Sequence, residues 1–148
     1  MDKTFDNIIE KLPYTSPFLF VDRLVHIDED GVMGNYTFSG DLDFYKGHFK
    51  DNPITPGAIL TECCAQIGVV CLGLFLLGDK TDDVKIALSS SEMEFYKAVY
   101  PEETVWVRST KKYFRFNKLK CEVKMFNAKE ELVCKGIIAG MLKSHTDA

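Results

Sequence analysis

The sequence has few of the residues that disulfide scaffolds, metal centres or nucleic-acid-binding surfaces require. It contains three histidines and five cysteines in 148 residues, and no two cysteines form a C-x-x-C pair. An odd number of thiols, in a chain long enough for its own core, argues against a disulfide framework. Lys and Arg number 18 against 22 Asp and Glu, a net charge of −4. Because phosphate binding needs clustered Lys and Arg, this balance argues against a nucleic-acid partner.

A signal-peptide pattern is also missing, because Met1 to Phe5 show no charged segment followed by an apolar one. Together with unpaired cysteines, this predicts a cytoplasmic protein. The 46% hydrophobic and 12% aromatic residues are typical of a globular chain. No repeat or linker divides the sequence. We therefore expect a single domain over residues 1–148, with a short helix within residues 1–12 and a flexible tail over residues 143–148.

One apolar run, from Ala58 to Leu77, is long enough to cross a membrane. However, Glu62 and Gln66 lie in its first two turns, and a carboxylate inside a bilayer is costly. Pro56, just before the run, is favourable near a helix start because its missing N–H would have no partner there. We therefore predict no membrane span, but a helix that is apolar on nearly all sides and buried in a soluble protein.

The sequence around this helix predicts β-strands. From Lys118 to Met125, charged and apolar residues alternate strictly, which places each kind on its own face of a strand. A turn is expected at residues 127–130, and a hairpin at residues 28–31, where Gly31 would supply a positive φ. The other strands are expected at residues 19–27, 32–38, 84–99, 104–116 and 132–142.

This order of elements predicts an α+β fold in which an antiparallel sheet wraps round one long central helix, the hot-dog arrangement. A sheet that buries one face needs a hydrophobic partner, and a single apolar helix supplies it. One sheet cannot cover every side of that helix. We therefore expect a second subunit to cover the rest, so that the protein is at least a dimer.

Candidate catalytic residues lie at the start of this helix and in the loop before it. His48 stands in a segment rich in Pro, Gly and Asn, and Glu62 follows fourteen residues later. An imidazole and a carboxylate at the mouth of an apolar interior form a candidate acid–base pair. The free N–H groups at the helix start, where Gly57 leaves room, could bind an oxyanion. Alternatively, His48 is a solvated loop residue, and Gln66 either hydrogen-bonds Glu62 or packs at an interface.

Cysteine chemistry is not expected. Cys63, Cys64 and Cys71 lie in the apolar run, where thiols behave as small hydrophobic side chains. No histidine or second cysteine pair completes a metal-ligand set beside Cys63 and Cys64. We therefore predict core cysteines and no metal.

A set of short motifs surrounds the two candidate residues and keeps its order over most of the chain. The motifs are P-F-L-F-V-D-R at 17–23, G-H-F at 47–49, N-P at 52–53, P-G at 56–57, E at 62 and A-Q at 65–66. This combination resembles the β-hydroxyacyl-acyl-carrier-protein dehydratases of the FabZ type, from about residue 12 to residue 142.

The resemblance implies a hot-dog fold assembled as dimers, often as trimers of dimers, with each active site between two protomers. His48 of one chain would act on the α-proton of a 3-hydroxyacyl thioester, and Glu62 of the other would protonate the departing hydroxyl. The thioester carbonyl would bind at the amide of Gly57. The supporting residues are Gln66, Phe49 and Pro56. No metal or other cofactor is implied, because the acyl group is carried on the phosphopantetheine of an acyl carrier protein or of coenzyme A.

The sequence departs from the family pattern at positions close to these residues. Lys50-Asp51 replaces the usual Pro-Gly, Thr55 a methionine, Cys63-Cys64 an Ala-Met pair, and Glu102 a glycine. Both catalytic candidates are retained. We therefore expect the family's reaction, with the substrate open between fatty-acid elongation and a specialised lipid or polyene pathway.

Two other functions stay open on these residues. A hot-dog thioesterase would hydrolyse the same class of substrate with a carboxylate-activated water, and a non-catalytic subunit would bind an acyl carrier or complete an oligomer. Because acyl carrier proteins are acidic, a local basic patch is expected near the entrance. The candidates for it are Lys46, Lys50, Lys97, Lys111, Lys112 and Arg115; each of them would alternatively be a solvated surface residue.

Overall fold

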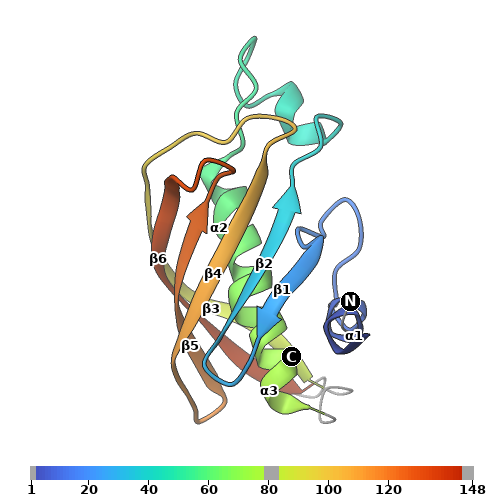
Figure 1. Ribbon diagram of the computed structural model, residues 1–148, viewed down its shortest axis with the longest axis vertical. Helices are drawn as coiled ribbons and strands as arrows, with labels where there is room; N and C mark the ends of the chain where they lie inside the picture. The colour runs from blue at the N-terminus through green and yellow to red at the C-terminus, as the bar shows by residue number, and fades with distance from the viewer. Residues whose placement is uncertain (1–2, 79–83, 145–148) are drawn as a thin grey trace.

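An antiparallel sheet of six strands curves around one long helix in the computed structural model, which describes residues 3–78 and 84–144 (Figure 1). The strands are β1 (Arg23–Ile27), β2 (Gly31–Thr37), β3 (Val84–Phe95), β4 (Thr104–Arg115), β5 (Lys118–Phe126) and β6 (Leu132–Ser144). Their order across the sheet is β1-β2-β4-β5-β6-β3. The predicted sheet round a central helix is confirmed, and β1 and β3 are its two edge strands.

The long helix runs from Gly57 to Leu77 and is the core helix of the fold. It comprises α2 (Gly57–Ala65), the π-helical segment η2 (Gln66–Cys71) and α3 (Leu72–Leu77). Its 21 residues have a mean hydropathy of 2.0 over the most apolar window, and 72% of that window is buried inside the protein. Most of its apolar surface is thus covered within the single chain. Two short helices, α1 (Lys3–Glu10) and the 3-10 helix η1 (Asp43–Lys46), complete the described elements.

The helix packs closely against the sheet at Gly68, in η2. A Cβ atom at this position would lie 2.9 Å from the Val123 side chain and 3.0 Å from that of Ser109. The Ser109 hydroxyl donates a hydrogen bond to the Gly68 carbonyl at 2.8 Å. The buried Ser109 side chain therefore satisfies the hydrogen-bonding capacity of a backbone carbonyl within the π-helical segment. No pattern in the sequence predicts this segment.

The core is formed by the inward faces of the strands and by the helix. On β5 the buried residues are Leu119, Cys121, Val123 and Met125, as the strict alternation predicts. All five cysteines are free and buried. Burial raises the pKa of the Cys63 thiol well above its usual range, so this thiol is not a ready nucleophile. The prediction of core cysteines is confirmed.

Two of the predicted strands are each four residues shorter than expected. Residues 19–22 precede β1, because the Phe20 backbone is hydrogen-bonded by side chains of the helix: its N–H donates to Gln66, and its carbonyl accepts from the Cys63 thiol. Residues 96–99 follow β3. There the N–H groups of Tyr96 and Lys97 both donate to the Val133 carbonyl, which ends the regular ladder.

The prediction that Gly31 supplies a positive φ is wrong, since its φ lies outside that region. The glycine is needed for another reason: a Cβ atom would collide with the backbone oxygen of Ser109 on the neighbouring strand. At the other end of the chain, β6 continues to Ser144, so the first two residues of the expected tail belong to the sheet. Residues 145–148 lie outside the described residues.

Candidate active site

His48 lies in the loop between η1 and α2, and a pair of hydrogen bonds to Ile54 fixes its position. The Ile54 N–H donates to the His48 carbonyl at 2.7 Å, and the His48 ring atom Nδ1 lies 2.9 Å from the Ile54 carbonyl oxygen. Because a carbonyl can only accept, Nδ1 carries the hydrogen in this contact. In the neutral ring the other nitrogen, Nε2, then has a free lone pair and can act as a base.

The loop itself is anchored to the body of the protein through Thr55. Its side chain is buried and hydrogen-bonded to the Tyr45 hydroxyl, and its N–H donates to the Val99 carbonyl at 2.8 Å. Burial raises the pKa of Tyr45, so that this phenol stays neutral. Thr55, which stands where the resembled family usually has a methionine, therefore anchors the loop that carries His48 to the segment after β3.

His48 opens into a hollow of about 420 Å³, here called the His48 hollow. Its other walls include Gly57 and Leu60 on α2, and Phe95 and Tyr96 at the end of β3. The Phe95 ring lies over the helix start, since a Cβ atom at Gly57 would approach it to 3.3 Å. The hollow is thus lined by both His48 and Gly57, the first residue of the helix.

The other expected supporting residues flank this hollow. The Phe49 ring stacks on the His48 imidazole with 4.1 Å between centroids and is 55% exposed. Pro56 precedes α2, and its carbonyl accepts hydrogen bonds from Ile59 and Leu60 at 2.9 and 3.0 Å. The Phe49 ring stack and the hydrogen bonds to Pro56 are contacts within the loop and the helix start, and neither of them involves Glu62.

Glu62 lies one and a half turns into α2 and is held by Gln66. The Gln66 amide nitrogen donates to Oε2 of Glu62 at 2.9 Å and to the Phe18 carbonyl at 3.1 Å, while its oxygen accepts from the Phe20 N–H at 2.8 Å. The fully buried Gln66 therefore uses both of its amide hydrogens and its oxygen. Of the two possibilities for Gln66, the hydrogen bond to Glu62 is the one observed.

Glu62 opens into a second hollow of about 230 Å³, here called the Glu62 hollow. Apolar side chains of the helix and of β3 line most of it, including Ala65, Val69 and Leu88. Tyr14 adds a phenol, whose pKa burial and the nearby Glu62 raise to about 12. At neutral pH the hollow thus contains a protonated phenol, a carboxyl group and an otherwise apolar wall.

Replacing Gln66 by leucine should remove the support of Glu62 and weaken the fold. The substitution leaves the buried Phe20 N–H without its partner, at a cost of about 1–3 kcal/mol, and also removes the hydrogen bond to the carbonyl of the half-exposed Phe18. We expect the free energy of unfolding, measured by urea denaturation, to fall by about 1–3 kcal/mol. An unchanged free energy of unfolding would contradict this role of the amide.

Within one chain, His48 and Glu62 open into separate hollows, so the expected pair is not assembled in a single protomer. Three contributors were not predicted: the Ile54 carbonyl, Tyr14 in the Glu62 hollow, and Phe95 over the helix start. A backbone carbonyl leaves no signal in residue type. The position of Phe95 follows only from where β3 ends.

Comparisons with known proteins place this site in a family. The FabA-like domain matches residues 12–139. The 3-hydroxyacyl-[acyl-carrier-protein] dehydratase FabZ of Wolbachia pipientis subsp. Culex pipiens is 33% identical, over 94% of this chain and 96% of its own. That of Sinorhizobium fredii is 32% identical, over 95% of this chain and 90% of its own.

Solved structures share the fold at low identity. A chain of the dehydratase heterocomplex ApeI:P from Xenorhabdus doucetiae has a TM-score of 0.80 at 13% identity and covers 95% of this chain and 93% of its own. A hypothetical thioesterase with coenzyme A from Streptococcus pneumoniae has a TM-score of 0.67 at 13% identity, over 94% and 96%. The predicted hot-dog fold is confirmed, and the chain belongs to the FabA-like family.

Proposed function

We propose that this protein is a hydro-lyase that converts 3-hydroxyacyl-[acyl-carrier-protein] to the trans-2-enoyl form, with His48 and Glu62 as its acid–base pair. The FabZ relatives supply the reaction class. The observation that carries the assignment of the pair is the position of the two hollows along β3. Phe95 and Tyr96, at one end of this strand, line the His48 hollow, whereas Ile86 and Leu88, at the other end, line the Glu62 hollow.

This placement supports a two-fold dimer formed through β3. The strand is a sheet edge, and an edge presents unpaired backbone N–H and carbonyl groups to a second strand. Leu88, Phe95 and Tyr96 on or beside it are each about half exposed, at 54%, 48% and 49%. Antiparallel pairing of two copies about a two-fold axis sets the Phe95 end of one strand against the Leu88 end of the other. Each His48 hollow then faces the partner's Glu62 hollow.

Such a site distributes the chemistry between two chains. His48 Nε2 takes the proton from the α-carbon of the substrate, and Glu62 of the partner subunit gives a proton to the departing hydroxyl. The Cα–H and Cβ–O bonds break, a double bond forms between these carbons, and water leaves. Because Gln66 donates to Oε2, the proton is carried on Oε1, which is free to face the substrate. The Gly57 N–H stabilises the charge that develops on the thioester oxygen.

The rest of the substrate is held by apolar surface and by its carrier. The acyl tail fits the apolar wall of the Glu62 hollow, beside Ala65 and Val69. The thioester is presented on phosphopantetheine, and the chain needs no metal or redox cofactor for an elimination. The protein acts in the cytoplasm with an acyl carrier protein as partner.

The proposal is tested by following absorbance as a 3-hydroxyacyl pantetheine thioester becomes the conjugated 2-enoyl form. Enoyl product, with no free thiol, is the result expected. Release of free thiol without enoyl product would favour a thioesterase instead, the activity for which the hypothetical thioesterase of the same fold is named. If neither signal arises with substrates of several chain lengths, pantetheine-bound and carrier-bound, the protein is a non-catalytic subunit.

A further inference from the structure

Three basic side chains form a continuous row across the outer face of the sheet, the face turned away from the helix. Arg108 on β4 is paired with Lys124 on β5, which is paired with Lys135 on β6. All three are exposed, while their chain neighbours such as Val107, Val123 and Cys134 are buried. We call Arg108, Lys124 and Lys135 the basic row.

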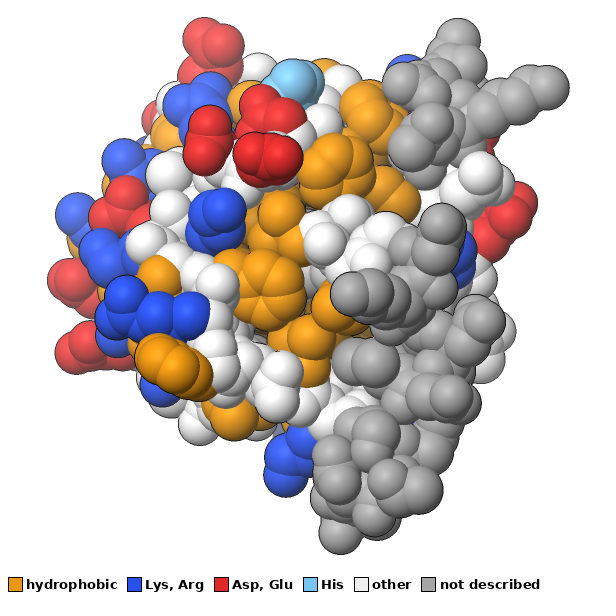
Figure 2. Space-filling view, turned by 90° about the horizontal axis from the view of Figure 1, so that it is seen from below, with side chains coloured by type: hydrophobic (Ala, Val, Ile, Leu, Met, Phe, Trp, Pro, Cys, Tyr) orange, Lys and Arg blue, Asp and Glu red, His pale blue; other side chains and the backbone are white. Residues whose placement is uncertain are grey.

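The basic row is unfavourable for the isolated protein. Like charges that stand directly opposite each other on paired strands destabilise a sheet. Among residues 3–78 and 84–144, none of the three cations lies within 4.0 Å of a carboxylate oxygen. The residue of β3 that is paired with Lys135 is the acidic Glu94, so the row of basic side chains ends at β6. At the lower end of the molecule, by contrast, basic and acidic side chains are interspersed (Figure 2).

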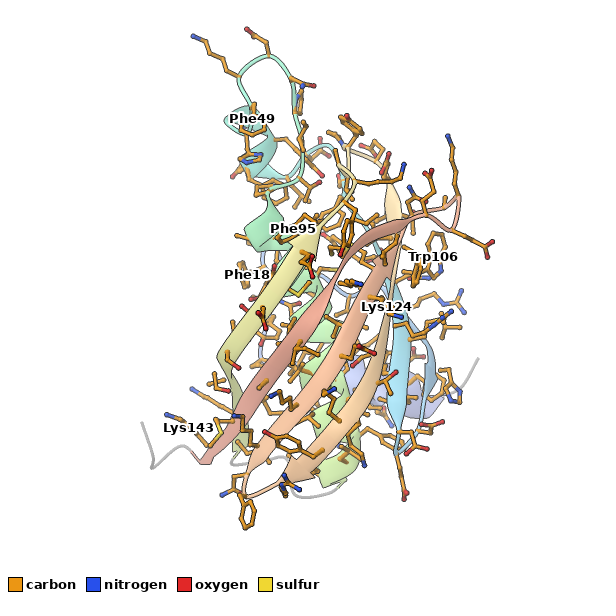
Figure 3. All side chains as sticks on the ribbon, turned by 90° about the vertical axis from the view of Figure 1, so that its left-hand side faces the viewer. Phe18, Phe49, Phe95, Trp106, Lys124 and Lys143 are labelled. Atoms are coloured by element: carbon orange, nitrogen blue, oxygen red, sulfur yellow. The ribbon has the colours of Figure 1, made fainter. Side chains whose placement is uncertain are left out.

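An aromatic hollow of about 360 Å³ adjoins the row at Arg108. Trp106 and Phe126 are a cross-strand pair on the same face, and both line this hollow together with Met33. The Arg108 guanidinium lies over the Phe126 ring, 5.4 Å from its centroid. Figure 3 shows Trp106 and Lys124 towards one end of the sheet, and Lys143 at the opposite end. The surface therefore combines three cations with a depression whose walls are mainly apolar but also include Asn127 and the carboxylate of Glu130.

The other end of the basic row reaches the proposed active site. The Lys135 ammonium lies over the Tyr96 ring, 5.9 Å from its centroid. Tyr96 in turn lines the His48 hollow. A molecule bound along the row is thus adjacent to the wall of the hollow in which the thioester would react.

We propose that the basic row and the Trp106 hollow are the docking surface for an acidic helix of the acyl carrier protein, an inference that rests on the proposed function. Neighbouring strands lie about 4.8 Å apart, so the cations repeat across the sheet at nearly the rise of one helical turn, about 5.4 Å. Carboxylates one turn apart on a helix laid across the strands can therefore each meet one cation. An apolar side chain of the same helix enters the hollow between Trp106 and Phe126.

The test is a charge reversal at the centre of the row, Lys124→Glu, assayed with three substrates that carry the same 3-hydroxyacyl group. With substrate bound to the acyl carrier protein of the same organism, KM should rise at least about fivefold at low salt, and the difference should shrink as salt is added. With the pantetheine thioester, which has no protein to dock, KM and kcat should stay unchanged. The matched control is Lys143→Glu, on the same sheet at the far end, which should behave as the unmodified protein with all three substrates.

The outcomes separate this proposal from the proposed function. An equal rise of KM with the coenzyme A thioester would show that the row binds phosphate and not a carrier helix, and an unchanged KM with the carrier-bound substrate would place docking elsewhere; either result overturns the inference. If the unmodified protein dehydrates no substrate, the proposed function fails. The docking surface is then judged by fluorescence anisotropy of labelled acyl carrier protein, which Lys124→Glu should weaken and Lys143→Glu should not.

Discussion

Replacing His48 by alanine is expected to lower kcat for dehydration by about 10²- to 10⁴-fold, the usual contribution of a positioned acid–base group. The Ile54 carbonyl holds Nδ1, so Nε2 is oriented as the base before substrate binds. The neighbouring side chain in the loop, Phe49, has no group that can take a proton. Absorbance of the enoyl product, measured with a 3-hydroxyacyl pantetheine thioester, gives kcat and KM directly.

Two controls separate loss of chemistry from loss of structure. Thermal unfolding of His48→Ala should differ little from that of the unmodified protein, because the side chain is only half-buried. His26→Ala removes another imidazole, one that is exposed on the hairpin and paired with Asp28, and should leave kcat unchanged. If folded His48→Ala kept more than about one tenth of kcat, the imidazole would not be the base.

Substitution of Glu62 by glutamine should cause a loss of similar size while keeping the shape of the side chain. The amide oxygen can still accept the hydrogen bond from Gln66, but the group has no acidic proton for the departing hydroxyl. A matched variant, Tyr14→Phe, changes the same hollow without touching this carboxyl group and should lower kcat far less. A Glu62→Gln enzyme with full kcat would remove Glu62 from the reaction.

Periodicity in the sequence was sufficient to predict the architecture. The strict alternation of β5 and the apolar run of the central helix follow from burial alone, so they could be predicted without knowledge of the contacts. The ends of the strands could not be predicted, because they depend on partners far along the chain. Residues 19–22 fit a strand by pattern, yet the Phe20 N–H is taken by Gln66, 46 residues away.

The candidate site shows the same division between local and distant information. His48, Glu62 and Gly57 could be selected because imidazole, carboxyl and helix-start N–H groups have recognisable chemistry. The groups that orient His48 and Glu62 could not be predicted. The Ile54 carbonyl and the Gln66 amide act through their positions in the fold, which residue type does not encode. Nor does the sequence show that the two hollows open at opposite ends of β3, which depends on the order of strands in the sheet.

Mixing two inactive variants provides the sharpest test of a site shared between chains. His48→Ala and Glu62→Gln, co-expressed with different affinity tags or refolded together, should recover about one quarter of the unmodified activity. Half of randomly formed dimers are mixed, and in each mixed dimer one site combines the intact His48 of one chain with the intact Glu62 of the other. The second site of that dimer lacks both residues and contributes nothing.

The same mixture excludes the alternative in which the two residues of one chain work together. In that case every chain of the mixture lacks one member of the pair, so no intact site can form in any dimer. Mixed dimers isolated through both tags should have about half of the unmodified activity if the site is shared, and no more than either parent variant if it is not. Because the separate hollows of a single protomer do not bring His48 and Glu62 together, recovery is the result that the structure requires of an acid–base pair.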